Sequence, residues 1–259
     1  MESVSEETLP LASGLSTPSL RLATHRIGIK TAFQPICDLN TRAILGYEAL
    51  LRPFDACCQR WLSPLSLLAE MPSPHLEQEL EWLGMHLCRA SESLPASTAV
   101  FLNVEPSTLA ASPDKLVAAL APSRFGWSSS QVVLEVTERG RGKIPQGVWR
   151  KAIAVIRQGG FRLAVDDWNL EHEGWSPLDW LAPDYAKIGP AGCLLDGDHG
   201  LDIARLIRHL QNRGIGCIVE GIEEEREIEQ ARQLGATWGQ GMALAAPSIV
   251  GLDPLGLEA

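Results

Sequence analysis

The stretch Phe161-Arg162-Leu163-Ala164-Val165-Asp166-Asp167 decides the fold of this 259-residue chain. An apolar run with β-branched content that ends in two carboxylates is typical of a buried parallel strand that delivers charge at its carboxyl end. Two adjacent acids are costly to bury unless a cation lies between them, and their oxygens are ligands that divalent metals prefer. An isolated Asp-Asp pair can also cap a helix or face water, so the rest of the chain has to decide between these roles.

Strand-like and helix-like segments alternate on both sides of this stretch. Segments 31–37 and 43–51 flank a short turn and predict an antiparallel hairpin. The pattern then predicts further strands at 99–104, 131–136, 161–167, 185–188, 216–220 and 237–240, and helices at 64–71, 75–91, near 109, and at 113–120, 146–158, 201–212 and 223–234. About eight strands that alternate with helices favour an α/β fold of the TIM-type (β/α)8 barrel class, modified by an antiparallel first strand, over an open sheet.

Composition narrows the class of protein further. The chain carries a formal net charge of −10 and shows no lysine or arginine cluster, which argues against duplex nucleic acid as a partner. Its amino-terminal sequence MESVSEETLP lacks a signal core, and no long apolar run predicts membrane insertion. We therefore expect a cytoplasmic protein with a flexible leader over 1–27 and one domain over 28–259. The six cysteines show no metal-ligand spacing and are expected to be reduced and mostly buried.

Polar side chains stand at seven successive predicted strand ends. They are Glu48, Asn103, Glu135, Asp166 with Asp167, Lys187, Glu220 and Gln240. In a barrel these ends open onto one face, where catalytic groups gather.

This set suits two divalent metals that clamp a phosphate for in-line attack. Four of its members supply oxygens for one metal: Glu48, Asn103, Glu135 and Asp166. The second metal would be held by Asp166, Asp167 and Glu220. Lys187 either holds the attacking hydroxide, offsets charge on the transition state, or forms a plain salt bridge. Glu220 is a candidate proton acceptor, and Gln240 can orient water or substrate.

Ordered motifs resemble the EAL domain, a bacterial family that hydrolyses cyclic di-GMP. In chain order the motifs are Phe33-Gln34-Pro35-Ile36, Tyr47-Glu48-Ala49-Leu50-Leu51-Arg52-Pro53, Phe101-Leu102-Asn103-Val104, Leu134-Glu135-Val136-Thr137-Glu138, Asp166-Asp167, Asp184-Tyr185-Ala186-Lys187-Ile188, Val219-Glu220-Gly221-Ile222-Glu223 and Gln240-Gly241. The likeness covers about residues 30–248, which is most of the chain.

The resemblance implies a metal-dependent phosphodiesterase that opens cyclic di-GMP to linear pGpG. It implies two Mg²⁺ or Mn²⁺ ions bound by Glu48, Asn103, Glu135, Asp166 and Asp167, with catalytic roles for Glu48, Lys187, Glu220 and Gln240. It further implies substrate contacts from Gln34, Leu51, Arg52, Asp184 and Glu223. A homodimer and a regulatory protein partner are the associations we expect.

The chain departs from the family after the two aspartates. The family usually continues Phe-Gly-Thr-Gly-Tyr-Ser-Ser, whereas residues 168–176 read WNLEHEGWS, and Gly189 replaces the usual aspartate after Lys-Ile. Within this loop Glu171, His172 and Glu173 are either new ligands or a solvated acidic loop, and Trp168 and Trp175 can line the substrate mouth or a subunit contact. The departure motivates an alternative, a catalytically weak or silent EAL domain that binds cyclic di-GMP or a protein. An unrelated metal-dependent barrel gives no reason for the ordered motifs.

Overall fold

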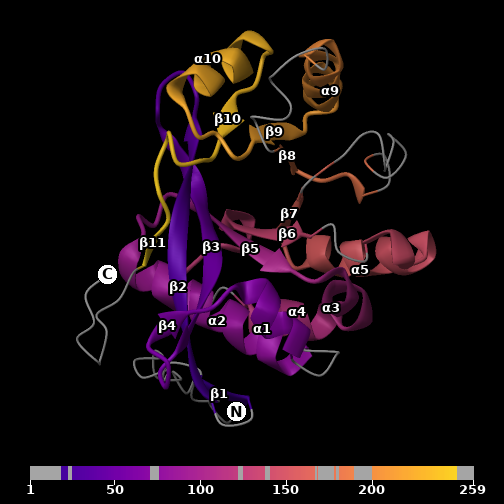
Figure 1. The fold of residues 1–259 in the computed structure, drawn as a ribbon. Helices are drawn as coiled ribbons and strands as arrows, with labels where there is room; N and C mark the ends of the chain where they lie inside the picture. Colours follow the sequence, from indigo (N-terminus) through magenta and orange to yellow (C-terminus); the bar gives the residue numbers. More distant parts are fainter. Residues whose placement is uncertain are drawn as a thin grey trace, which may run out of the picture.

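Eight strands close into a barrel in the computed structural model, which describes residues 19–22, 25–70, 76–121, 125–137, 141–166, 168, 178, 181–189 and 200–249. Around the ring the strands are β2 (His25–Asp38), β10 (Trp238–Gly239), β9 (Gly216–Val219), β8 (Tyr185–Ile188), β7 (Arg162–Val165), β6 (Val132–Val136), β5 (Ala99–Val104) and β3 (Ile44–Asp55). A β2–β3 pairing closes the ring (Figure 1). Strand β2 is antiparallel to both neighbours, and the other pairings are parallel. The predicted modified TIM-type barrel with an antiparallel first strand is confirmed.

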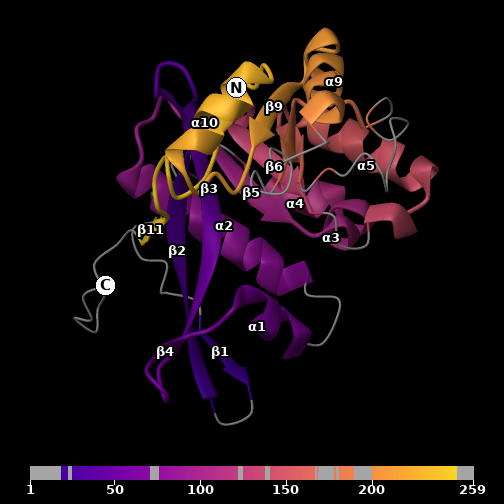
Figure 2. The same ribbon diagram turned by 45° about the horizontal axis from the view of Figure 1, so that its top comes forward.

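Helices cover the outside of the barrel (Figures 1 and 2). They are α1 (Pro64–Glu70), α2 (Leu76–Ser93), α3 (Pro106–Ala111), α4 (Pro113–Ala119), α5 (Gln146–Gln158), α9 (Gly200–Asn212) and α10 (Glu225–Gln233), with 3₁₀ turns at Ser129–Gln131 and Arg141–Lys143. In α5 the buried residues Trp149, Ile153 and Ile156 recur at three- and four-residue intervals, the spacing of one helix face. This face joins the core that lies between strands and helices.

The hairpin β2–β3 is much longer than predicted. With 14 and 12 residues, its strands run past the barrel, where β1 (Ser19–Leu22) pairs with β2 and β4 (Arg60–Trp61) pairs with β3 (Figure 1). Strand β11 (Ser248–Ile249) also pairs with β2. Residues 19–22 pair in register with 25–28, and the division into a leader over 1–27 and a domain over 28–259 stays a prediction. Residues 1–18 lie outside the described residues.

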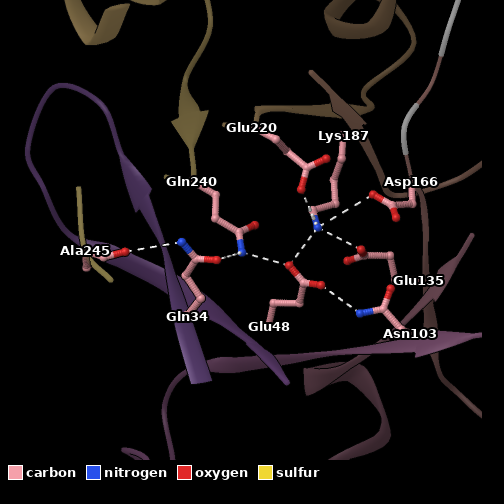
Figure 3. Close-up of polar contacts among 9 residues, drawn as sticks. All are labelled: Gln34, Glu48, Asn103, Glu135, Asp166, Lys187, Glu220, Gln240 and Ala245. Atoms are coloured by element: carbon pink, nitrogen blue, oxygen red, sulfur yellow. Dashed lines mark hydrogen bonds and ion pairs between the residues drawn. The ribbon is translucent and has the colours of Figure 1, made fainter. Parts of the chain in front are cut away.

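Side chains that point into the barrel form two layers, because alternate residues of a strand face the same side. We call the apolar one the lower layer: Ile36, Ala99, Phe101, Val133, Ala164, Tyr185 and Ile218. Two residues further along five of the parallel strands the inward side chains become polar. With Glu48 and Gln240 they form the upper layer: Glu48, Asn103, Glu135, Asp166, Lys187, Glu220 and Gln240 (Figure 3). The upper layer therefore lies at the carboxyl ends of β5, β6, β7, β8, β9 and β10, whereas Glu48 lies in the middle of β3, which runs on past the barrel.

Exposed thiols correct one expectation from the sequence. Cys37 and Cys217 are buried as predicted, but Cys57 and Cys58 are exposed in the turn between β3 and β4, and Cys88 is half-buried. Cys193 lies outside the described residues. None of the helices in the described part of the chain is long and apolar enough to cross a membrane.

Candidate active site

Backbone hydrogen bonds fix three residues of the upper layer just past their strands. Asp166, Glu220 and Gln240 each follow the last residue of a strand, and their N–H groups donate to the strand beside them. The acceptors are the carbonyls of Val136 at 3.1 Å, Ile188 at 2.8 Å and Val219 at 2.8 Å, respectively. The barrel therefore fixes the start of each of these loops, and with it the position of the three side chains at the end of the barrel where the parallel strands end.

The Lys187 ammonium lies at the centre of the upper layer (Figure 3). Lys187 is only 1% exposed, and its Nζ contacts four carboxylates. The partners are Glu220 at 2.6 Å, Glu135 at 2.7 Å, Glu48 at 2.9 Å and Asp166 at 3.8 Å. When all four carboxylates are ionised they outnumber the single ammonium, so the group is then short of positive charge.

Two amides hold the Glu48 carboxylate (Figure 3). Asn103 Nδ2 donates to Oε1 at 2.7 Å, and Gln240 Nε2 donates to Oε2 at 2.7 Å. Gln240 Nε2 also lies 3.2 Å from Gln34 Oε1, and Gln34 Nε2 donates to the Ala245 carbonyl at 3.3 Å. A chain of amides thus connects β2, β10 and β3, the region where the antiparallel strand closes the barrel.

Burial and mutual repulsion displace the pKa values of these groups. Burial, followed by repulsion from Glu48, raises the pKa of Glu135 well above its usual range. Burial, despite the attraction of Lys187, raises the pKa of Glu220 to about 8. Burial also acts to raise the pKa of Glu48, but Lys187 and the donated hydrogen bonds outweigh it and leave that pKa lowered. The acids in turn hold the pKa of Lys187 well above its usual value against the effect of burial.

The upper layer has the donor chemistry of a divalent-cation site. Carboxylate and amide oxygens are hard ligands, and two of them, Glu135 Oε2 and Gln240 Oε1, are buried without a hydrogen-bond partner. The four acids of the upper layer turn toward Lys187, and among the described residues no three His, Cys, Asp or Glu side chains form a ready metal-ligand cluster. A bound cation would therefore draw carboxylates away from the ammonium. Asp167, the remaining predicted ligand, lies outside the described residues.

A cavity of about 370 Å³ opens beside the upper layer. Its wall includes Arg52, Leu51, Asn103 and Asp166, and apolar side chains from α1 and α2 close the far side: Pro64, Leu65, Leu68, Trp82 and Leu83. Arg52 is half-buried, and its Nη1 donates to the Leu51 carbonyl at 3.0 Å. Burial lowers the pKa of Arg52 and the Glu48 charge raises it, but guanidinium stays charged at any ordinary pH. The cavity is thus lined by the Arg52 guanidinium, by members of the upper layer and by apolar side chains.

Two predicted substrate contacts lie away from this set. Asp184 precedes β8 and stands at the amino end of the strand, opposite to the mouth. There its Oδ2 accepts hydrogen bonds from Arg157 Nη1 at 2.5 Å and from the Leu163 N–H at 2.8 Å. This geometry places Asp184 away from the upper layer, and a substrate contact from it stays a prediction. Glu223 lies exposed in the loop between β9 and α10, with its N–H donating to Glu227 at 2.7 Å.

Sequence reasoning missed two buried polar residues of the cavity wall, Glu79 and His86, both on α2. Burial raises the pKa of Glu79 to about 7 and lowers the pKa of His86 to about 4. His86 Nδ1 lies 2.7 Å from Thr31 Oγ1. The signal available in the sequence was their spacing, because Glu79 is four residues before Leu83 and therefore falls on the apolar face of the helix.

The structure describes Gly189 but only one residue of the altered segment 168–176. A Cβ at Gly189 would lie 3.0 Å from Glu220 Cβ, so the glycine leaves the space that Glu220 occupies. In the altered segment 168–176 only Trp168 is described. Its backbone N–H donates to the Lys187 carbonyl at 2.9 Å. The other predictions for this loop, on Glu171, His172, Glu173 and Trp175, fall outside the described residues.

Known proteins resemble this chain over most of its length. PdeD of Escherichia coli K12, named a probable cyclic di-GMP phosphodiesterase, is 26% identical over 244 residues, which are 88% of this chain and 43% of that protein. The cyclic di-GMP phosphodiesterase RocR of Pseudomonas aeruginosa is 26% identical over 234 residues, 83% of this chain and 56% of that protein. This chain thus spans about half the length of these two relatives.

Solved structures also resemble this chain over most of its length. The calcium and cyclic di-GMP complex of Klebsiella pneumoniae BlrP1 superposes with a TM-score of 0.75 and 26% identity, over 86% of this chain and 57% of that one. A family model described as EAL domain matches residues 18–247. The chain therefore belongs to the EAL domain family.

Proposed function

We propose that this chain hydrolyses cyclic di-GMP to linear pGpG with two divalent cations, Mg²⁺ or Mn²⁺. The observation that carries the proposal is the convergence of four carboxylates on Lys187 at the carboxyl ends of the strands. In the ionised state these acids carry more negative charge than Lys187 neutralises, which favours cations, and phosphodiesterases are among the relatives at 26% identity.

The proposed metal ligands are Glu48, Asn103, Glu135, Asp166 and Asp167. Cations bound there would activate water and neutralise charge on the attacked phosphate. The orphaned Oε2 of Glu135 supports this assignment, because a buried acceptor without a partner is costly. Solved relatives hold manganese or calcium together with cyclic di-GMP.

Residues around the cavity would bind the nucleotide. The Arg52 guanidinium can hold two phosphate oxygens at once, with Leu51 beside it on the wall. Gln34 and Gln240, already joined to each other, would orient substrate or water. Glu223 remains a proposed contact at the edge of the mouth.

Lys187 and Glu220 would perform the proton and charge chemistry. The Lys187 ammonium offsets charge as water adds to phosphorus. Glu220, whose pKa burial raises to about 8, is a stronger base than a solvated glutamate and accepts a proton from that water. One P–O3′ bond breaks, the released 3′-oxygen takes up a proton, and the phosphate stays on the 5′ side of the linear product.

A hydrolysis assay tests the proposal. The purified chain is incubated with cyclic di-GMP and saturating Mn²⁺ or Mg²⁺, and pGpG is followed by chromatography. Turnover should vanish with a chelator and in Glu48→Ala, and should persist in Glu77→Ala, which removes an exposed acid of α2. A folded wild-type protein that forms no pGpG with either metal rejects the proposal.

A second candidate is a receptor that binds cyclic di-GMP without turnover. The altered sequence at 168–176, directly after the predicted metal ligands, motivates it. Calorimetry that detects nucleotide binding in a protein without turnover selects this candidate. The expected homodimer also remains a prediction, which light scattering checks.

A further inference from the structure

Glu79 lies on the wall of the cavity but belongs to neither layer of the barrel. It stands in the first turn of α2 and is only 8% exposed. The cavity that it lines also contains Arg52, Asn103 and Asp166. A carboxyl group buried at this depth needs partners that repay its lost hydration.

The partners of Glu79 lie at the start of α3. Glu79 Oε1 accepts a hydrogen bond from the Glu105 N–H at 2.6 Å, and its Oε2 accepts one from the Thr108 hydroxyl. Glu105 is the residue that precedes α3, and its own side chain makes no capping hydrogen bond. Glu79 thus reaches across from α2 and accepts hydrogen bonds at both ends of the first turn of α3, from the N–H of the residue before the helix and from the Thr108 hydroxyl.

The segment that Glu79 holds leads directly back to the upper layer. Asn103 is two residues before Glu105, and between them Val104 is fully buried in register with Val136 of β6. Asn103 Nδ2 donates to Glu48 Oε1 at 2.7 Å. With its NH₂ group on Glu48, the amide directs its oxygen elsewhere as an acceptor. The orientation of this amide therefore depends on where the turn after β5 is fixed.

We propose that Glu79 is a positioning residue that sets the Asn103 amide, and through it the Glu48 carboxylate, for a divalent cation. This inference rests on the proposed function for the cation, but the chain of contacts from Glu79 to Glu48 is formed without one. Side chains that orient ligands typically change metal affinity by about 10- to 100-fold when they are removed.

Mn²⁺ titration by calorimetry, well below the melting temperature, tests the effect on the cation. Glu79→Ala should weaken Mn²⁺ binding about 10-fold or more. Glu79→Gln keeps an oxygen for the Glu105 N–H and should restore binding to within about threefold of wild type. Glu77→Ala, an exposed acid of the same helical turn, is the matched control and should bind as wild type does.

A second measurement reports on Asn103 without any metal. In ¹H–¹⁵N spectra of the metal-free protein, the side-chain NH₂ signals of Asn103 should move in Glu79→Ala and stay near their wild-type position in Glu79→Gln. If Glu79→Ala does not fold, Thr108→Val removes one of the two partners and should move the same signals by a smaller amount.

These readouts separate the two proposals. Wild-type protein that binds no Mn²⁺ contradicts the proposed function, while a shifted Asn103 signal still supports the positioning role. Mn²⁺ affinity and Asn103 signals that stay unchanged in Glu79→Ala, with only the melting temperature lowered, show a purely structural contact and overturn the inference.

Discussion

The two layers inside the barrel are built by the same strands but have opposite physical character. Ile218 lies in β9 and Glu220 is the first residue after this strand, and both side chains point inward. Ile218 is apolar and fully buried, whereas Glu220 is an acid whose pKa is raised to about 8. Tyr185 and Lys187 repeat this contrast on β8. The apolar lower layer, which stabilises the barrel, is therefore only two residues along these strands from the upper layer, which places charged groups inside it.

The difference teaches where the stability and the chemistry of this domain reside. Apolar burial in the lower layer contributes free energy of folding in proportion to area. The upper layer holds two buried and two half-buried carboxylates against one buried ammonium, an arrangement whose desolvation opposes its attraction. Substitutions in the two layers should therefore affect stability and activity in different ratios.

The largest effect is expected for Lys187→Met, which breaks the upper layer. Removing this ammonium leaves the carboxylates to repel each other in a buried site, which costs about 3–5 kcal/mol of the free energy of unfolding. Hydrolysis should also be lost. Denaturant unfolding in a chelator at pH 8 measures the first effect, with Lys115→Met on the exposed face of α4 as control. Equal stability of the two variants would contradict it.

Glu79, a buried acid outside both layers, should make the free energy of unfolding depend on pH. Burial raises the pKa of Glu79 to about 7, so the folded state binds this proton more tightly than the unfolded state does. Its contribution to stability is complete below about pH 4.5 and is lost as the pH rises through 7, by up to about 3 kcal/mol.

Glu79→Gln cannot titrate, so the difference in free energy of unfolding between this variant and wild type should shift in favour of the variant from pH 5 to pH 8. Denaturant unfolding at four pH values measures it. The lowered pKa of His86 acts in the opposite direction but is common to both proteins and cancels. A difference that stays constant with pH would show that Glu79 titrates normally.

A smaller effect is expected where the upper layer is crowded. In Gly189→Ala the added Cβ would lie 3.0 Å from Glu220 Cβ, so Glu220, whose Oε1 lies 2.6 Å from Lys187 Nζ, must shift. We expect a cost of about 1–3 kcal/mol and a loss of activity of about 10-fold. Melting curves and turnover measure both. Gly147→Ala on α5, where a Cβ meets nothing within 4 Å, is the control. Unchanged turnover in Gly189→Ala would show that Glu220 does not depend on this space.

The smallest effect is expected for Ile218→Val in the lower layer. Loss of one buried methylene group costs about 0.5–1.5 kcal/mol, because Ile218 is fully buried. Turnover and Mn²⁺ affinity should stay at the wild-type level, since the layer above keeps its groups. A loss of Mn²⁺ affinity in this variant would show that the layers are not separable.

Much of the barrel and of the upper layer can be predicted from sequence. Apolar runs such as 99–104 and 161–165 end at polar residues, and parallel strands bring those ends together. Asp184 lies in the same matched motif as Lys187, but it precedes its strand and therefore lies at the other end of the barrel. A shared motif does not state which end of the strand each residue occupies.

The remaining features depend on contacts that the sequence does not encode locally. Strands β4 and β11 have two residues each, too few for a period to appear, and they exist because β2 and β3 extend past the barrel. Glu79 meets Glu105 and Thr108 across 26 and 29 residues of chain. Tertiary packing alone brings these residues together.

The central claim is that the upper layer is a divalent-cation site in which carboxylates exchange an ammonium partner for metal. Calorimetric titration of Mn²⁺ into the wild-type protein and Glu135→Gln tests it most directly, because Glu135 Oε2 is buried without a partner. The account predicts saturable binding to wild type that weakens at least about 10-fold in Glu135→Gln. Equal affinity in the two proteins, or no binding to the folded wild type, would contradict it.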